Sequence, residues 1–433
     1  NDYLGNIVHP ISQSLQYLTE DGKLSNNATA QNINFYDYYG IEENVGYQFL
    51  WHSGTVLPAW VTNLYGDEIT IGGENYTVYD IDNPNVREMW EQIFEMLIPQ
   101  IEDSNTTQLG YILANEPHWF TDASASFNVT GISQYTSAKF EAWLAETYGT
   151  VEALNTNWGT EYASFDDVDM QVPTDLESLR GTPKYYDWCR FNMDRVNDWF
   201  QFLHDGITEF DEDATTHIKI FPRIVVDENG QRDHGIDIEY LTSLTEYNGN
   251  DVTIRKRLPN ATSDEWWEEN YIYDWRELAM TYAMLDSFNP DTLNVNSESH
   301  FLNGNAYADM YTTTQYTRSV YWLSAMLGNN VNMTWWWPRY GDGSIEPRLQ
   351  TSQMGKTFAG SVATMPLVAN EITQTFFDLN SVSDTIVKFQ RQDMPIRVLY
   401  SETACIVDAD QINRTFEMFE ALYFEGTSIG FAS

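Results

Sequence analysis

Basic residues are scarce in this chain. Lys and Arg together number 22 of 433 residues, against 64 Asp and Glu, so the formal net charge at pH 7 is −42. Nucleic acids and anionic membrane surfaces are both bound through basic faces, so the charge argues against either as a partner. A strongly acidic surface keeps a protein soluble at high salt, which indicates a marine or halophilic source.

Long apolar runs, cysteine clusters and glycine-rich loops are also missing. No run reaches the roughly 18 apolar residues of a membrane-spanning helix. The two cysteines, Cys189 and Cys405, are far apart in the sequence and fit neither a disulfide framework nor a zinc cluster. No glycine-rich phosphate loop follows a predicted strand, which weakens a nucleotide-binding interpretation. We therefore expect no metal and no cofactor.

The chain does have ample material for a core. Hydrophobic residues make up 42% and aromatic residues 15% of it, too many for an acidic disordered tail. Short apolar strands alternate with amphipathic helices, which predicts βα units and a parallel sheet. The predicted strands lie at 47–53, 109–114, 217–224, 244–252, 293–299 and 330–337, and the helices at 84–97, 185–206, 274–286 and 305–327.

These units fit either a (β/α)8 barrel or a doubly wound sheet. Polar residues cluster where the predicted strands end, and barrel enzymes build their active sites at that end, so the barrel is favoured. We predict an α/β fold with a (β/α)8 barrel over residues 1–385, its first strands unclear or missing. Residues 386–433 read as strand, helix and strand. A single such unit cannot cover both faces of its sheet, so we interpret it as the truncated start of a second, open α/β domain.

Two predicted strands each end in a glutamate. Asn115-Glu116-Pro117 follows one strand, and Glu298 lies near the end of another. Carboxylates on separate barrel strands can face each other across the barrel mouth, as glycosidic cleavage requires. One carboxyl protonates the leaving oxygen and must hold its proton near neutral pH, whereas the other attacks the anomeric carbon and must stay ionised. The pair therefore predicts a glycosidase.

The same residues resemble clan A glycoside hydrolases, especially the β-galactosidases of glycoside hydrolase family 42 and the related family 86 agarases and porphyranases. The segment 139–162 is similar to the stretch that follows the acid/base strand in family 42, and LPAW (57–60) to the turn after its third strand. The match in the first segment is carried by Phe140, Trp143, Leu144, Tyr148, Gly149, Leu154, Asn155, Trp158, Gly159 and Thr160.

The resemblance implies a retaining enzyme with Glu116 as acid/base, Asn115 beside it on the sugar, and Glu298 as nucleophile. It also implies that the C-terminal unit begins a glutamine-amidotransferase-like domain. The chain departs from the family in two respects. The cysteine cluster that binds zinc in some members is absent, and the early strand that supplies an arginine to the nucleophile is not recognisable.

The substrate prediction rests on aromatic and basic side chains near the strand ends. Three of the few basic residues form the run 255–257, just after a predicted strand, and arginine binds sulfate or carboxylate through two donors. We therefore expect an anionic red-algal galactan of the agar, porphyran or carrageenan type. The candidate substrate-binding residues are Asn115, Trp51, His52, His118, Trp119, Arg223, Arg255, Arg257, His300, Trp336 and Trp337.

Other interpretations stay open. One is an exo-acting β-galactosidase on small neutral oligosaccharides, and another is a sugar-binding barrel without catalysis. An oxidoreductase or transferase on the same fold is opposed by the missing phosphate loop and metal ligands. We expect a bacterial protein that is secreted or periplasmic, and a homo-oligomer is left open.

Overall fold

Parallel strands form the centre of the molecule. The computed structural model describes residues 9–12, 18–23, 45–50, 57–71, 76–102, 110–122, 131–168, 176–222, 230–256, 273–300, 312–335, 362 and 365–433. Within this part of the chain, the central strands are His9–Ser12 (β1), Val45–Leu50 (β2), Tyr111–Asn115 (β3), Thr216–Lys219 (β4), Tyr247–Asn250 (β5), Leu293–His300 (β8) and Asn329–Trp335 (β9).

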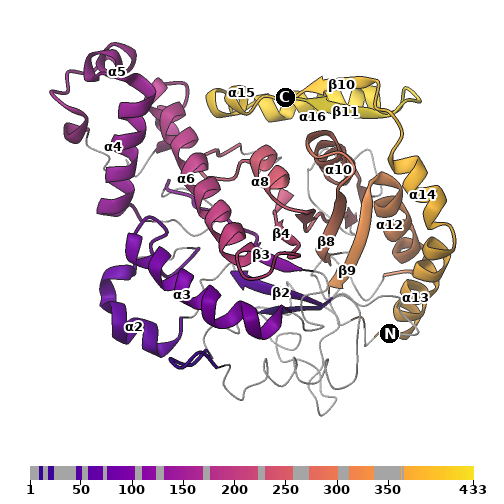
Figure 1. The fold of residues 1–433 in the computed structure, drawn as a ribbon. Coiled ribbons are helices and arrows are strands. Elements are labelled where there is room, and N and C mark those ends of the chain that lie inside the picture. Colours follow the sequence, from indigo (N-terminus) through magenta and orange to yellow (C-terminus); the bar gives the residue numbers. More distant parts are fainter. Residues whose placement is uncertain are drawn as a thin grey trace, which may run out of the picture.

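The order of these strands follows the chain. β1, β2, β3 and β4 pair in that order, and β5, β8 and β9 form a second parallel group. A parallel bridge between Ile220 and Asn250 joins the two groups. Helices lie outside the strands on both sides (Figure 1), so the described elements form a curved parallel wall inside a helical layer, as a (β/α)8 barrel requires.

The surrounding helices are Ala59–Tyr65 (α2), Pro84–Ile101 (α3), Gln134–Tyr148 (α4), Val151–Trp158 (α5), Pro183–Thr208 (α6), Ile238–Leu244 (α8), Arg276–Phe288 (α10), Thr314–Leu327 (α12), Pro366–Ser381 (α13), Ser383–Gln390 (α14), Glu402–Val407 (α15) and Gln411–Tyr423 (α16). Short 3-10 turns cover Gly66–Ile69, Phe165–Asp167 and Leu176–Leu179. Two small sheets complete the structure. One pairs Arg255–Lys256 (β6) with Tyr273–Asp274 (β7), and the other pairs Ile396–Leu399 (β10) with Ile429–Ala432 (β11).

Local sequence signals set several helix ends. The Asn83 side chain accepts a hydrogen bond from the Asn85 N–H at the start of α3, with Pro84 in the first position, as predicted. Along α6, the residues expected on the core side are all buried: Trp188, Phe191, Val196, Trp199, Phe200 and Leu203. The last four belong to the main core, whereas the first two pack in a second cluster with α4 and α5, and this burial stabilises the helix more than its intrinsic propensity does.

The structure differs from the sequence-based prediction in places. Strand β1 was not predicted, and β4 ends at Lys219 rather than continuing to 224. The predicted strand 396–404 ends at Leu399, because Ser401 caps α15 by accepting a hydrogen bond from the Ala404 N–H. The serine cap starts a helix directly after the strand, so the strand ends although the residues before the cap favour β structure.

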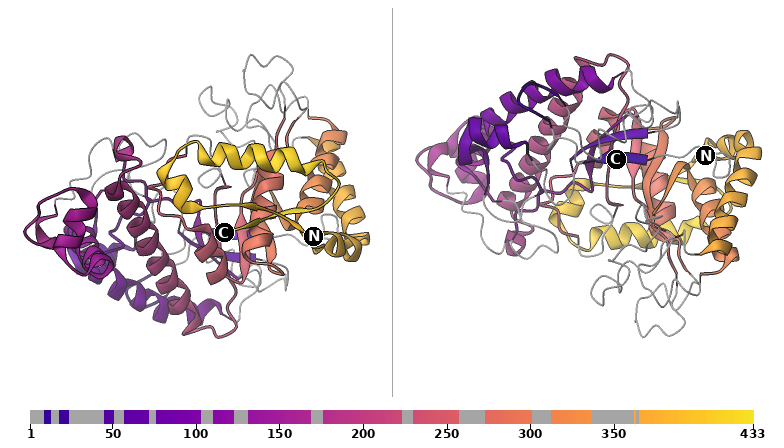
Figure 2. Two further views of the ribbon diagram at one scale, coloured as in Figure 1. Left: turned by 90° about the horizontal axis from the view of Figure 1, so that it is seen from above. Right: turned by 90° about the horizontal axis from the view of Figure 1, so that it is seen from below.

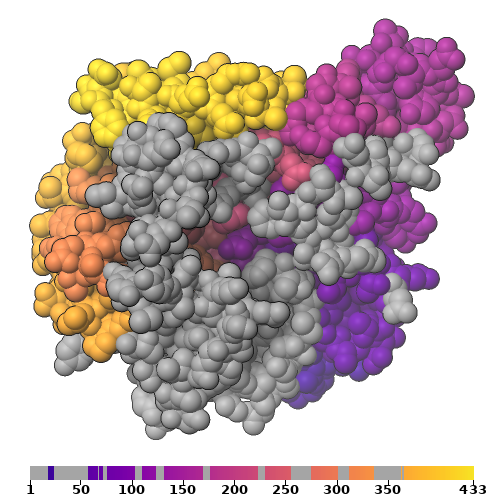
Figure 3. All heavy atoms as spheres, turned by 180° about the vertical axis from the view of Figure 1, so that it is seen from behind, coloured from indigo at the N-terminus to yellow at the C-terminus, as the bar shows by residue number. Residues whose placement is uncertain are grey.

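The C-terminal unit has the two predicted strands, β10 and β11, paired in parallel, but two helices, α15 and α16, lie between them where one was predicted. It packs against the outside of the helix layer next to α10 (Figure 2), and the Phe431 N–H donates to Ser287 Oγ at 2.9 Å. Viewed from behind (Figure 3), the C-terminal unit lies beside the region around residue 180. There Arg180 Nη1 donates a hydrogen bond to the Cys405 carbonyl at 2.8 Å. Buried apolar side chains of this unit therefore join the core formed with α10.

Candidate active site

Glu116 lies in a strained turn directly after β3. Its φ is 50°, in the left-handed region that residues other than glycine rarely adopt. Three hydrogen bonds hold the turn. The Glu116 N–H donates to the Lys219 carbonyl at 2.9 Å, His118 Nδ1 lies 2.9 Å from the Glu116 carbonyl oxygen, and the Tyr76 hydroxyl donates to the Asn115 carbonyl at 2.7 Å. Strain of this kind persists only where the surroundings enforce it, and it concentrates at functional sites. The Glu116 side chain keeps 24% of its surface exposed, so a substrate can reach it.

Glu298 lies within strand β8, and both of its carboxylate oxygens are contacted. Oε1 lies 3.0 Å from His300 Nε2, and Oε2 contacts the ammonium group of Lys219. The backbone is held as well, because the Glu298 N–H donates to Asn296 Oδ1 at 3.2 Å. The side chain remains 12% exposed. The carboxylate is therefore oriented by two donors yet still accessible.

Lys219 joins the two glutamates. It is the last residue of β4, its side chain is only 2% exposed, and its Nζ lies 3.8 Å from Glu116 Oε1 while contacting Glu298. Two oxygens that both reach one nitrogen can be no more than roughly 7 Å apart, given ordinary hydrogen-bond lengths. Retaining glycosidases have carboxyl groups roughly 5–5.5 Å apart, and that separation lies within this upper bound.

Asp251 adds a third carboxyl. It follows β5, is buried, and shares a hydrogen bond with Glu116. Burial raises the pKa of Asp251 well above its usual range, and the nearby Glu116 charge raises it further, while Lys219 opposes the shift. Burial likewise lowers the pKa of Lys219, with Asp251 and Glu116 acting against that change. Asp251 and Glu116 are therefore a coupled pair that favours holding one proton between them.

His300 is a neutral donor beside Glu298. Burial lowers the pKa of His300 to about 4, and the Lys219 charge contributes to that direction. The imidazole is thus uncharged near neutral pH, and in the Nε2–H tautomer it donates to Glu298 Oε1. The ring also packs on Trp335, with the ring centroids 5.5 Å apart.

The two glutamates therefore have opposite surroundings. Glu116 shares a hydrogen bond with Asp251, a carboxyl whose pKa is raised by burial, whereas Glu298 is contacted by an ammonium and an imidazole, which favour the ionised form. When two carboxyl groups lie in environments that give them different proton affinities, one can act as the acid and the other as the nucleophile. The arrangement is capable of double-displacement cleavage of a glycosidic bond.

Buried polar side chains support the turn that carries Glu116. Asp233 Oδ2 accepts hydrogen bonds from the backbone N–H groups of Thr121 and Asp122, each at 2.7 Å. Asn192 of α6 donates through Nδ2 to the Trp119 carbonyl at 2.9 Å. The chain after Glu116 is therefore tied to α6 and to the segment before α8.

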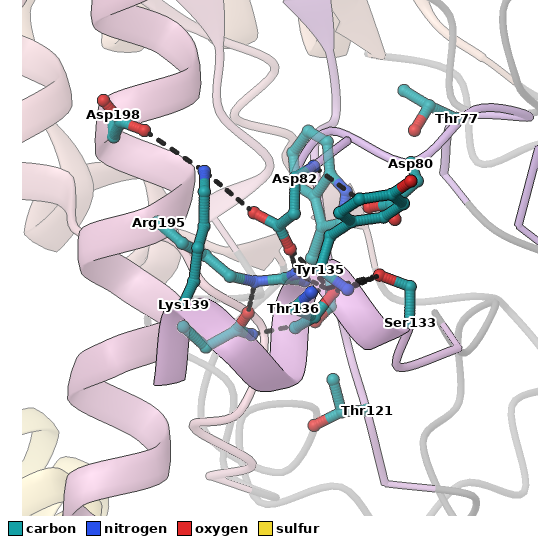
Figure 4. A network of polar contacts seen from close by, with 12 residues as sticks. Thr77, Asp80, Asp82, Thr121, Ser133, Tyr135, Thr136, Lys139, Arg195 and Asp198 are labelled. Atoms are coloured by element: carbon teal, nitrogen blue, oxygen red, sulfur yellow. Dashed lines mark hydrogen bonds and ion pairs between the residues drawn. The ribbon is translucent and has the colours of Figure 1, made fainter. Parts of the chain in front are cut away.

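A buried ion pair continues this support (Figure 4). Arg195 of α6 donates through Nε to Asn192 at 2.6 Å and through Nη1 to Asp82 Oδ2 at 2.5 Å. Two side chains of α4 reach the same carboxylate. Thr136 Oγ1 donates to Asp82 at 2.7 Å, and Lys139 Nζ lies 3.2 Å from it. Helices α4 and α6 are thus joined to the loop before α3 by one polar network.

Only part of the predicted site falls within the described residues. The structure brings Glu116, Glu298 and His300 around Lys219, with Asn115 adjacent. The side chains of six further candidates and of Arg255 lie outside the described part of the chain. The six are Trp51, His52, Arg223, Arg257, Trp336 and Trp337.

Trp119 and His118 occupy a different place from the predicted one. Trp119 is 1% exposed, and its ring packs against Tyr76 and Phe200. His118 is 4% exposed and bonds the turn of Glu116. Both side chains are buried because the turn folds back onto the core, so they shape the site from behind and do not offer a ring face to a sugar.

Two residues of the site were missed in the sequence. Lys219 lies in the apolar run HIKIF, and Asp251 follows a weak strand. Lysine is almost never fully buried without a partner, so a lysine within an otherwise apolar predicted strand of such an acidic chain was a usable signal. Asp251 carried no comparable signal, because it is one of 64 acidic residues.

The described residues show neither a cluster of metal ligands nor a membrane-spanning helix. No group of three or more His, Cys, Asp or Glu side chains in this part of the chain is arranged to hold a metal ion. Among the described helices, none is long and apolar enough to span a membrane.

Comparison with known proteins bears on the family. The family 42 model, described as beta-galactosidase, matches residues 57–270. A curated relative, beta-galactosidase Bga of Halorubrum lacusprofundi, is 34% identical over 79 residues, which are 17% of this chain and 11% of that protein. The resemblance to glycoside hydrolase family 42 is confirmed, and it supports a glycosidase.

Solved structures confirm the (β/α)8 fold. The family 42 exo-carrageenase of Bacteroides ovatus is 34% identical with a TM-score of 0.84, over 100% of this chain and 56% of that one. The β-galactosidase of Rahnella sp. R3 is 15% identical with a TM-score of 0.70, over 100% and 61%. This chain thus spans little more than half the length of these proteins. The second, amidotransferase-like domain stays a prediction.

Proposed function

We propose that this protein is a retaining glycoside hydrolase that cleaves β-galactosidic bonds, with Glu116 as acid/base and Glu298 as nucleophile. The observation that carries the proposal is the meeting of both carboxylates at the Lys219 ammonium, one beside a further carboxyl and the other between two donors. Family 42 similarity over residues 57–270 supports the same reaction class.

The first step forms a glycosyl-enzyme. A Glu298 oxygen attacks the anomeric carbon, the bond to the leaving oxygen breaks, and Glu116 transfers its proton to that oxygen. Asn115, adjacent to Glu116, would hydrogen-bond the sugar 2-hydroxyl, a contact that strengthens in the transition state.

The second step releases the sugar. Glu116, now ionised, takes a proton from water as the water oxygen attacks the anomeric carbon, and the electron pair of the broken bond returns to Glu298. His300, which donates to Glu298 in the Nε2–H tautomer, stabilises the carboxylate that departs.

The proposed substrate is an anionic red-algal galactan, of the carrageenan type before the agar and porphyran types. Similarity to an exo-carrageenase over the whole of this chain supports that choice. The basic residues Arg223, Arg255 and Arg257 would bind sulfate groups in a chain that is otherwise strongly acidic. An exo-acting β-galactosidase on small neutral substrates is the second candidate, favoured by the description of the matching family model.

For the domain division and the cellular location we propose what the sequence predicts. We propose a barrel over residues 1–385, a unit at 386–433 that begins a second α/β domain, and a secreted or periplasmic location in a marine bacterium. The packing of β10, β11 and α16 on α10 is compatible with a domain that rests on the barrel.

A substrate panel tests the proposal. Release of reducing ends is measured from carrageenan, agar, porphyran and neutral β-galactosides, with chemically desulfated carrageenan as the matched control. We expect cleavage of sulfated carrageenan, less of the desulfated polymer, and none with Glu116→Gln or Glu298→Gln. Cleavage of small neutral galactosides alone would support the second candidate. Undiminished activity in either Gln variant would refute the catalytic assignment, and binding without cleavage would indicate a silent sugar-binding barrel.

A further inference from the structure

Lys219 is a buried ammonium without a role in the reaction as written. Its Nζ contacts Glu298, lies 3.8 Å from Glu116 Oε1, and is attracted by the Asp251 carboxyl. The side chain is 2% exposed, so little of its charge is screened by water. Burying an ammonium costs several kcal/mol unless it is paired. The position of this charge therefore bears on the function of the neighbouring carboxylates.

The charged and titratable groups around Lys219 come from several elements. They are Glu116 after β3, His217 on β4 itself, Asp251 after β5, Glu298 and His300 on β8, and, beside Asp251, Glu277 of α10. Both histidines have pKa values lowered mainly by burial, to about 3 for His217 and about 4 for His300, so both are neutral near pH 7. Lys219 is therefore the single cation in this cluster of described residues.

The Lys219 ammonium lies closer to Glu298 than to Glu116. Lys219 contacts Glu298 directly but lies 3.8 Å from Glu116, which also shares a hydrogen bond with Asp251. Coulomb attraction grows as distance falls, and it is strong in a buried site. The ammonium thus favours the charged form of Glu298 more than that of Glu116.

We propose that Lys219 is a positioning residue for Glu298, an inference that rests on the proposed function. Lys219 keeps the Glu298 carboxylate charged and oriented, and it stabilises this carboxylate as the leaving group of the second step. In the first step the Glu298 charge is transferred into a bond to the sugar, and the ammonium loses its anionic partner. In the second step the charge returns to Glu298 beside Lys219. Loss of the ammonium should therefore slow release of the sugar more than attack on it.

Kinetics with a nitrophenyl β-galactoside test this division. In Lys219→Met we expect sugar release to slow by about 10²-fold, the range seen when one preorganised donor is removed. A burst of nitrophenol should then precede a slow steady state. The acid limb of the kcat/KM profile should move to higher pH, because Glu298 becomes protonated sooner. Lys219→Arg should restore part of both effects, which loss of packing alone would not explain.

A titration that needs no activity separates this proposal from the proposed function. The full chain is labelled with carboxyl-13C glutamate, and the Glu298 signal is assigned by its loss in Glu298→Gln. In Lys219→Met the midpoint of that signal should move up by about one pH unit or more, an electrostatic effect of ordinary size. An unchanged midpoint overturns the proposal even if the protein is an active hydrolase. A shifted midpoint in a protein that cleaves no glycoside supports the role of Lys219 on Glu298 and refutes the proposed function instead. Should Lys219→Met not fold, Lys219→Gln is titrated in its place.

Discussion

The two sides of the site are built in different ways. Glu116 lies in an irregular turn with a positive φ, and its position depends on hydrogen bonds to the main chain around it. Glu298 lies in a regular strand, and its environment is made by two side chains, Lys219 and His300. One carboxyl is thus placed by backbone geometry, and the other is controlled by neighbouring charge and donors.

The supporting layers differ accordingly. Behind the Glu116 turn, a buried network runs from Asn192 through Arg195 to Asp82 and links α6 to the loop before α3. Beside Glu298, the described side-chain contacts come from Lys219 of β4 and from His300 of the same strand, β8. The Glu116 side, proposed as the acid/base, should therefore be sensitive to changes in stability, and the Glu298 side, proposed as the nucleophile, to changes in charge.

The largest expected effect distinguishes the two carboxyls by their chemistry. Glu298→Gln should lower kcat by at least about 10⁴-fold on every substrate, because the covalent step is lost. Glu116→Gln should lose about 10²–10⁴-fold on galactosides with poor leaving groups, the usual contribution of a general acid. On dinitrophenyl galactosides, whose leaving group needs no proton, its first step should be nearly normal.

Azide provides the control for this comparison. A small anion can replace water without base catalysis, so azide should restore turnover of dinitrophenyl galactoside in Glu116→Gln by forming the β-galactosyl azide. It should not do so in Glu298→Gln. Rescue of Glu298→Gln with retention of configuration would reverse the two assignments.

The next effect concerns the stability of the acid/base side. Arg195→Met leaves the Asp82 carboxylate, whose side chain is fully buried, without its closest cation. Breaking a buried pair costs about 3–5 kcal/mol when the remaining charge is uncompensated, and since Lys139 still lies 3.2 Å from Asp82 we expect the lower end of that range. Urea unfolding monitored by tryptophan fluorescence measures the loss.

Arg318→Met is the matched control. Arg318 pairs with Asp378 at 2.5 Å, but the two side chains are 40% and 51% exposed. Water screens such a pair, so its loss should cost less than about 1 kcal/mol. Equal losses in the two variants would show that the network behind Glu116 contributes no special rigidity.

The smallest effect concerns pH on the nucleophile side. His217 is fully buried on β4, and burial with the Lys219 charge lowers its pKa to about 3. Because the folded-state value lies below the ordinary 6.5, His217 contributes stability above pH 6.5 that is lost as the pH falls toward 3. His217→Leu should therefore lose less stability than the parent between pH 7 and pH 5, by about 2 kcal/mol.

His204→Leu is the control of opposite sign. A hydrogen bond to Glu246 raises the pKa of His204, so its contribution is present at low pH and is lost as the pH rises. Relative to the parent, His204→Leu should be more destabilised at pH 5 than at pH 8. Parallel pH curves for both variants and the parent would contradict the assigned burial of His217.

Several parts of the structure were readable in the sequence because their signals are local. Asn83 and Pro84 begin α3 where the capping rule predicts, and the apolar stripe of α6 is buried as its spacing indicates. Glu116 and Glu298 were predicted as the catalytic pair from their places at strand ends, and the structure brings both to Lys219. Trp119 was misread as a sugar platform, since nothing in its neighbours reveals that the turn folds back onto Tyr76 and Phe200.

The sequence by itself determined the alternation of strands and helices, the two glutamates and the acidic character of the chain, because periodicity, capping and composition are properties of neighbouring residues. Only the tertiary structure decided which residues meet at those glutamates. Lys219, Asp251 and His300 come from three different strands or strand ends, and their proton affinities depend on burial and on charges distant in the sequence. Basic residues are scarce in this chain. Only the fold shows that one buried lysine, Lys219, lies between the proposed catalytic carboxylates.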